Sequence, residues 1–244
     1  MNKIKITLLL FVAGLQMASA NIIQAGMVDD FENGTTASWT KANRLKQAKI
    51  LPPENIVDET GNRYLQIKSR GATTQDKNKE DPHSRMVFYN QSQWAGDYSA
   101  ITNITARMKA TSQTEDNLYM RLALFDEKVN DQPQSRYVSK AANILKTDGE
   151  WHFLSFSLNP LDLVRFRGNK SVAEVLKNVS QLRFLSSKDQ AAAWQVDKVK
   201  AVLGVDDITA VAVVPAAVPL PASLWFMLTA MAGLIKAVRR SYIA

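Results

Sequence analysis

The chain has 244 residues, no cysteine and two histidines, and its formal net charge is +7. The lack of cysteine excludes disulfides and cysteine-based zinc sites, and two histidines are too few for a multi-histidine metal centre. Five of the 30 basic residues lie in the two terminal segments, residues 1–20 and 213–244, which contain no acidic residue. Residues 21–212 therefore contain 25 basic and 23 acidic residues. This near-neutral balance does not indicate nucleic-acid binding.

The N-terminal residues have the order of a secretory signal peptide. Lys3 and Lys5 precede an apolar run over residues 6–15, and a small-residue site with Ala18 and Ala20 follows it. The alternative is a buried helix of a soluble domain, but such a helix would carry a polar face that this run lacks. Residues 1–20 are therefore predicted to direct export and to be cleaved by signal peptidase after Ala20.

The segment from residue 21 to residue 212 is predicted to form one all-β domain. Period-two alternation of apolar and polar side chains, which is typical of strands with one buried face, occurs at 63–68, 101–110, 118–125, 151–158, 181–185 and 201–210. Turn-forming pairs such as Asn33-Gly34 and Asp148-Gly149 separate these runs. Only residues 171–177, with Ser171 as the N-cap, suggest a helix. The pattern predicts an antiparallel β-sandwich.

Three short motifs of this domain resemble the galactose-binding-like jelly rolls of carbohydrate-binding modules. They are Asp29-Asp30-Phe31-Glu32-Asn33-Gly34, Asp148-Gly149-Glu150-Trp151 and Gly204-Val205-Asp206-Asp207-Ile208. The resemblance implies a jelly-roll β-sandwich in which the first and last strands lie side by side and a core strand begins after Asp148-Gly149. Trp39, Trp94 and Trp151 are expected in the core, since large aromatic side chains are mostly buried.

The resemblance also implies a structural calcium ion, because modules of this kind often hold one. A Ca²⁺ ion takes roughly six to eight oxygen ligands. If the terminal strands pair, the candidate ligands are Asp30, Glu32, Asp206 and Asp207. The alternative is that these acidic side chains flank turns and face solvent, or protect an exposed sheet edge.

Sugar binding needs aromatic faces and polar groups on the open face of a sheet. The candidate carbohydrate-binding residues are Tyr119 and Arg121 on one strand face and Tyr137 and Arg183 on other strands, with Tyr64 and Arg107 as further neighbours. The alternative is that they are ordinary cross-strand partners. No Gly-x-Ser-x-Gly or His-Glu-x-x-His pattern occurs, so no catalytic residue is assigned.

The C-terminal tail consists of a proline-containing box, an apolar segment and a basic end. The box is Val218-Pro219-Leu220-Pro221-Ala222, and Arg239 and Arg240 form the basic end. Because proline cannot continue a helix, a transmembrane helix is expected over about residues 223–238. These 16 residues would reach about 24 Å, short of the roughly 30 Å of a bilayer core, with the arginines on the cytoplasmic side.

The order of these three parts resembles the PEP-CTERM sorting signal, in the variant whose box is VPLPA. This resemblance implies recognition and cleavage by an exosortase, and the alternative is a permanent anchor in the inner membrane. The sequence therefore predicts an exported, non-catalytic protein of the cell surface or extracellular matrix that associates with polysaccharide. The alternatives are a carbohydrate-active lyase or hydrolase on a similar sandwich, and a membrane-anchored structural protein of the envelope.

Overall fold

The computed structural model describes residues 21–41, 53–72, 84–127, 133–192 and 195–212. The predicted signal peptide with Ala18 and Ala20 lies outside the described residues, as does the predicted tail with Val218 to Ala222, the helix over 223–238, Arg239 and Arg240. Within the part of the chain that is described, no helix is long and apolar enough to cross a membrane.

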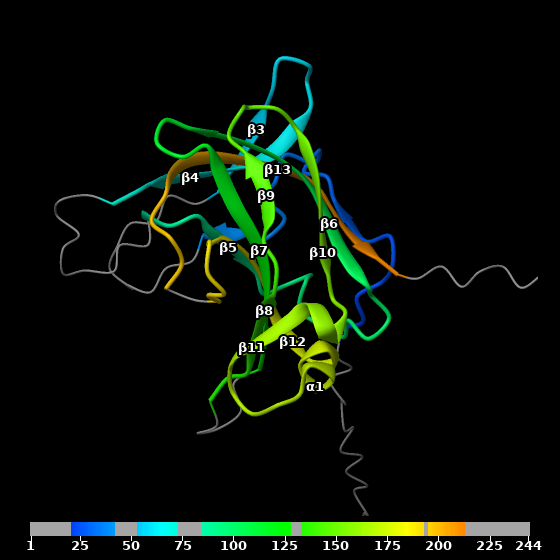
Figure 1. Cartoon of the computed structure of the whole chain (residues 1–244). Coiled ribbons are helices and arrows are strands. Elements are labelled where there is room, and N and C mark those ends of the chain that lie inside the picture. Colours follow the sequence, from blue (N-terminus) through cyan, green and yellow to red (C-terminus); the bar gives the residue numbers. More distant parts are fainter. Residues whose placement is uncertain (1–20, 42–52, 73–83, 128–132, 193–194, 213–244) are drawn as a thin grey trace, which may run out of the picture. The chain divides into compact units, whose positions relative to one another are not determined.

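The described residues form strands joined by turns, with one short α-helix and one short 3-10 helix (Figure 1). In chain order the elements are β1 (Val28–Asp29), β2 (Thr40–Lys41), β3 (Glu54–Val57), β4 (Arg63–Arg70), β5 (Val87–Asn90), β6 (Asn103–Ser112), β7 (Asn117–Asp126), β8 (Arg136–Ser139), β9 (Asn143–Lys146), β10 (His152–Ser157), η3 (Pro160–Asp162), β11 (Leu163–Arg167), α1 (Val172–Lys177), β12 (Val179–Ser186) and β13 (Lys200–Val211).

Two antiparallel sheets form the sandwich. The six-stranded sheet has the order β10-β6-β13-β4-β3, with β1 on β13, and the seven-stranded sheet has the order β11-β8-β7-β12-β5-β2, with β9 on β7. In the pairing of the first and last strands, Val28 lies opposite Thr209 and Asp29 opposite Ile208. The predictions of an all-β antiparallel sandwich and of adjacent terminal strands are confirmed.

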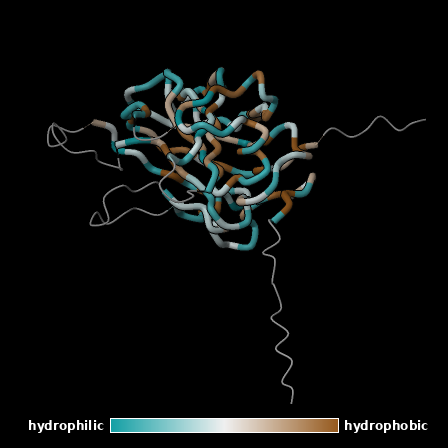
Figure 2. Tube along the Cα trace, turned by 90° about the horizontal axis from the view of Figure 1, so that it is seen from below, coloured by the Kyte–Doolittle hydropathy of each residue, from teal (hydrophilic) through white to brown (hydrophobic). Residues whose placement is uncertain are grey.

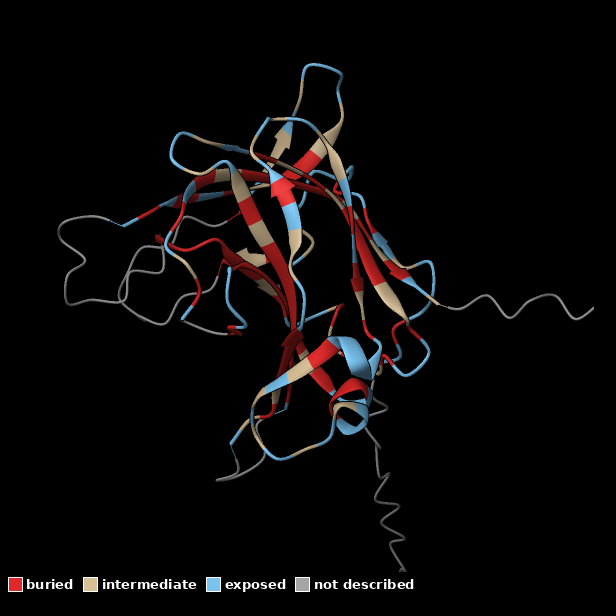
Figure 3. Ribbon diagram, in the orientation of Figure 1, coloured by how far each residue is buried: buried red, intermediate tan, exposed pale blue. Residues whose placement is uncertain are grey.

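The core lies between the sheets and follows the alternation of the sequence. Leu65 and Ile67 of β4 belong to one buried apolar cluster with Leu118, Met120 and other alternate residues of β7. Figure 3 shows buried and less buried positions along the strands. Hydrophobic and hydrophilic stretches accordingly alternate along the trace (Figure 2). The predicted helix is also present: Ser171 accepts a hydrogen bond from the Glu174 amide, and the Glu174 carboxylate accepts one from the Ser171 amide at 2.7 Å.

A buried carboxylate links β1 to two core tryptophans. Asp29 is 8% exposed, and its Oδ2 accepts hydrogen bonds from the indole nitrogens of Trp39, at 2.6 Å, and Trp94, at 2.7 Å. The side-chain amide of Gln93 donates to both carboxylate oxygens, at 2.8 and 3.1 Å. Burial raises the pKa of Asp29, and these three donors oppose the rise. The expected burial of Trp39 and Trp94 is confirmed.

Candidate functional site

Arg121 lies on the outer face of the seven-stranded sheet, but its side chain is buried. Its guanidinium group donates hydrogen bonds of 2.7 to 3.0 Å to four backbone carbonyls, those of Ser139, Lys140, Ser187 and Lys188. Burial lowers the pKa of Arg121. Because these bonds use most of its donors, Arg121 holds two loops to the sheet instead of facing a ligand.

The side chains of Arg183 and Tyr137 are likewise engaged in contacts within the protein. The Arg183 guanidinium lies 4.3 Å from the centre of the Phe125 ring and donates to the Gln181 side chain at 2.8 Å. Its burial lowers the pKa of Arg183 to about 10. Tyr137 points into the core between the sheets, and its hydroxyl donates to the Lys170 carbonyl at 2.9 Å.

The outer face of the seven-stranded sheet is covered by the chain that follows β12. Ala191, Ala192 and Val196 are buried there in a second apolar cluster with Ala123, Phe125 and neighbouring side chains. Of the four predicted carbohydrate-binding residues, Tyr119 is partly exposed, Arg121 and Arg183 are buried, and Tyr137 is internal. The structure does not bring them together as one open surface, and sugar binding by them stays a prediction.

The four candidate calcium ligands form two groups, each engaged in contacts within the protein. Asp30 accepts a hydrogen bond from the Glu32 amide at 3.2 Å, and Glu32 accepts one from the Arg63 amide at 3.0 Å. Asp206 and Asp207 lie beside Arg107, whose nitrogen is 3.7 and 3.2 Å from their respective oxygens. Among the described residues, no three acidic or histidine side chains gather in a group that could hold a metal ion. Calcium binding stays a prediction, and these contacts give it no added support.

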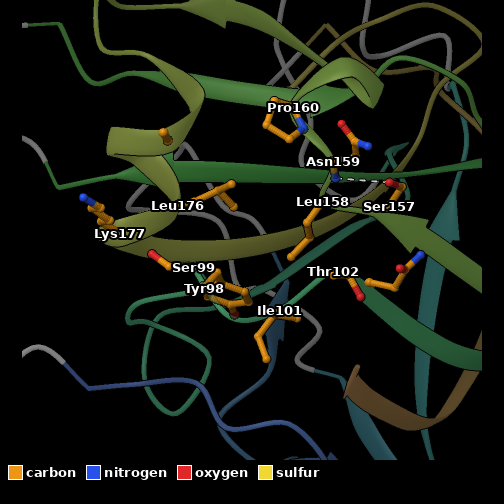
Figure 4. A pocket seen from close by; sticks show the side chains of 12 residues that line it. Tyr98, Ser99, Ile101, Thr102, Ser157, Leu158, Asn159, Pro160, Leu176 and Lys177 are labelled. Atoms are coloured by element: carbon orange, nitrogen blue, oxygen red, sulfur yellow. Dashed lines mark hydrogen bonds between the residues drawn. The ribbon is translucent and has the colours of Figure 1, made fainter. Parts of the chain in front are cut away.

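A groove of about 580 Å³ lies between α1, the residues before β6 and the turn after β10 (Figure 4). Its floor is mainly apolar, with Ile101, Leu158 and Leu176. The Tyr98 hydroxyl is already bonded to the Trp94 carbonyl at 2.7 Å. The residues that line the groove include no carboxylate and no histidine, so it could hold a small apolar group but offers no acid–base pair.

The exposed face of the six-stranded sheet carries a cluster of rings and cations, which we call the aromatic–cation platform. It consists of Tyr64, Arg107, Lys109, Trp151 and Phe153. The Tyr64 and Trp151 rings meet edge to face, with centroids 5.5 Å apart. Lys109 Nζ lies 4.1 Å from the centre of the Tyr64 ring and 4.6 Å from that of Trp151, and the Arg107 guanidinium lies 5.1 Å from the Trp151 ring. Phe153 is 69% exposed.

Strand register and one glycine assemble the platform. Phe153 lies opposite Arg107 in the pairing of β10 with β6, and Gly204 of β13 lies opposite Lys109. A Cβ atom at Gly204 would lie 2.9 Å from Lys109 Cγ and 3.2 Å from Tyr64 Cδ2. Because glycine lacks this atom, the stem of Lys109 can cross β13 and reach the Tyr64 ring on β4.

The platform differs from the sequence-based predictions in the position of one tryptophan and in two site residues that were not predicted. Trp151 was expected in the core, but it is partly exposed and lies on the outer face, so that prediction is wrong. Lys109 and Phe153 were not predicted as site residues. A usable signal existed, since Trp151 and Phe153 alternate in register with Ser155 and Ser157, whereas Leu154 and Phe156 occupy the buried face.

No known protein family matches the chain, and neither does any curated protein. Among solved structures, the chain is similar to a family 11 carbohydrate-binding module from Clostridium thermocellum in complex with a β-1,3-1,4-mixed-linked tetrasaccharide, with 16% identity over 77% of this chain and 95% of that one and a TM-score of 0.50. A solution structure of CtCBM11 gives 13% identity, coverage of 82% and 100%, and a TM-score of 0.50. The xylan-binding domain of Paenibacillus barcinonensis Xyn10C gives 14% identity, coverage of 80% and 99%, and a TM-score of 0.43. At these identities the likeness to the two structures with a TM-score of 0.50 shows the fold alone, and the expected jelly-roll sandwich is confirmed.

Proposed function

We propose that this chain is an exported, non-catalytic protein that binds polysaccharide through the aromatic–cation platform. The observation that carries the proposal is the partly exposed Trp151 and the 69% exposed Phe153, which lie beside Arg107 and Lys109 on an open sheet face. Aromatic rings pack against the C–H faces of sugar rings, and basic side chains donate hydrogen bonds to sugar oxygens. The structural neighbour in complex with a mixed-linked tetrasaccharide supports the proposal, since it has a similar fold.

The cellular part of the proposal comes from the two ends of the sequence. The order of charge, apolar run and small residues in residues 1–20 supports export. The box from Val218 to Ala222, with its apolar segment and basic end, supports transient or permanent attachment to the inner membrane and processing by an exosortase. Placement at the cell surface or in the extracellular matrix would bring the platform into contact with polysaccharide.

Affinity electrophoresis of the purified full chain tests the proposed binding. Gels that contain mixed-linked β-glucan, xylan or alginate are expected to retard the protein in at least one case. Retardation in none of them would contradict the proposal. Release of reducing ends or unsaturated sugars from the same polymers would contradict its non-catalytic part and favour a hydrolase or a lyase.

Replacing Phe153 by alanine is expected to weaken polysaccharide binding about five- to thirtyfold, since a ring that stacks on a sugar contributes about 1 to 2 kcal/mol. The melting temperature should hardly change, because the side chain is largely exposed. The matched control is Ile144→Ala, which removes an exposed apolar side chain from β9 of the other sheet. Equal binding by wild type, F153A and I144A would exclude Phe153 from the contact surface.

A further inference from the structure

We infer that the platform binds an acidic polysaccharide, whose uronate carboxylates pair with the ammonium group of Lys109. The inference rests on the proposed function and specifies the class of its ligand. It follows from how the rings are used, from the distribution of charge across the sheet face, and from the position of Phe153.

The Tyr64 and Trp151 rings of the platform are in contact with cations, which leaves little of their faces free for stacking on a sugar. Tyr64 is only 7% exposed, with Lys109 Nζ 4.1 Å from its ring centre and the Trp151 ring against it. The Trp151 ring has both Lys109 and Arg107 within 5.1 Å of its centre. Because ring faces attract cations, the two aromatic side chains hold Lys109 in place. A neutral sugar would find these two faces largely occupied.

Among the described residues Lys109 forms no direct ion pair, and its charge acts on a carboxylate only at longer range. The pKa of Asp58, just after β3, is lowered mainly by a hydrogen bond from Thr60 and to a smaller extent by Lys109. Arg107 pairs with Asp207 at 3.2 Å and lies 3.7 Å from Asp206, and Lys68 pairs with Glu54 at 3.0 Å. No carboxylate of the described residues lies within ion-pair distance of Lys109 Nζ. Lys109 is therefore held by two rings and not by a direct ion pair, so a uronate group of a ligand could pair with it directly.

Phe153 supplies the apolar surface that such a polymer also needs. It lies opposite Arg107 in the sheet and two residues from Trp151 in the chain, and the residue is 69% exposed. Nothing in the described cation–ring contacts occupies its faces. One sugar unit could stack on Phe153 while the carboxylate of a neighbouring unit pairs with Lys109.

The test uses alginate and the same alginate after chemical reduction of its carboxyl groups, which removes charge and keeps the polymer backbone. The full chain is expected to bind alginate at least tenfold more tightly than the reduced polymer, and added salt should weaken the alginate complex. Lys109→Gln should weaken alginate binding about tenfold or more and leave binding of the reduced polymer unchanged. Lys109→Arg, which keeps the charge, should retain most of the affinity.

Lys68→Gln is the matched control, because it removes an equal charge from the same sheet face at a lysine that already pairs with Glu54. It should change alginate binding less than twofold. Equal binding of alginate and its reduced form, or undiminished alginate binding by K109Q, would overturn the inference and leave the proposed function standing. Failure to bind alginate, reduced alginate, mixed-linked β-glucan and xylan would instead overturn the proposed function itself.

Discussion

Replacing Asp29 by alanine is expected to lower the free energy of unfolding by about 3 to 5 kcal/mol. The change leaves three donors without an acceptor, the indole N–H groups of the buried Trp39 and Trp94 and the side-chain amide of Gln93. An unpaired buried polar group costs about 1 to 3 kcal/mol, and the missing carboxylate also leaves a cavity. Urea unfolding of the full chain, followed by tryptophan fluorescence, measures the loss.

Two variants control this result. Asp29→Asn keeps one side-chain oxygen that can accept from the indoles, so its loss should be smaller than that of D29A. Asp30→Ala removes the neighbouring exposed carboxylate, and we expect a change of at most about 0.5 kcal/mol. If D29A is no less stable than D30A, the carboxylate does not hold the two tryptophans as the structure indicates.

Replacing Trp151 by alanine is expected to weaken polysaccharide binding about thirtyfold or more, at little cost in stability. The indole is the platform member that contacts Tyr64, Lys109 and Arg107 at once, so its loss releases both cations from the positions in which they meet the ligand. Because Trp151 is only partly buried, the expected loss of unfolding free energy is about 1 kcal/mol. Affinity electrophoresis and urea unfolding of the same preparation measure the two effects.

Trp94→Ala provides the contrast, because Trp94 is fully buried. Truncation of a buried aromatic side chain costs about 3 to 5 kcal/mol, which is the loss expected for a core tryptophan. The account would be contradicted if W151A were destabilised as strongly as W94A, or if it bound polysaccharide as well as wild type.

The longer strands could be predicted from the sequence, whereas most of the shorter ones could not. The alternating runs at 63–68, 118–125 and 201–210 correspond to β4, β7 and β13 with ends within two residues. Strands such as β1 and β2 have two residues each, too few to show a period. They form because another strand pairs with them, as the twelve-residue β13 does with β1, and a local pattern does not contain that information.

The candidate site was harder to predict than the fold, because alternation separates two faces without saying which face stays open. Arg121 and Arg183 do lie on the outer face of their sheet, but the chain that follows β12, including Ala192 and Val196, covers that face. The contact between Lys109 and Tyr64 depends on the register of three strands and on Gly204 between them. Neither the covering segment nor this register leaves a periodic signal in the sequence.

Trp151 shows the limit of composition as a guide to burial. Aromatic side chains are usually buried, and the turn before Trp151 resembles the start of a core strand, so both arguments placed it in the core. The strand is a core strand through Leu154 and Phe156, but Trp151 and Phe153 occupy its other face. The face that a residue shares with Ser155 and Ser157 was the better guide.

Chemical-shift mapping of the isotope-labelled full chain during titration with alginate tests most directly whether the platform is the ligand-binding surface. The expected result is a shift of the Trp151 indole N–H and of backbone amides in β6 and β10, while the amides of β7 and β12 stay unchanged. Shifts confined to β7, β12 and Tyr119, with the Trp151 indole unmoved, would place the ligand on the other sheet and contradict the account.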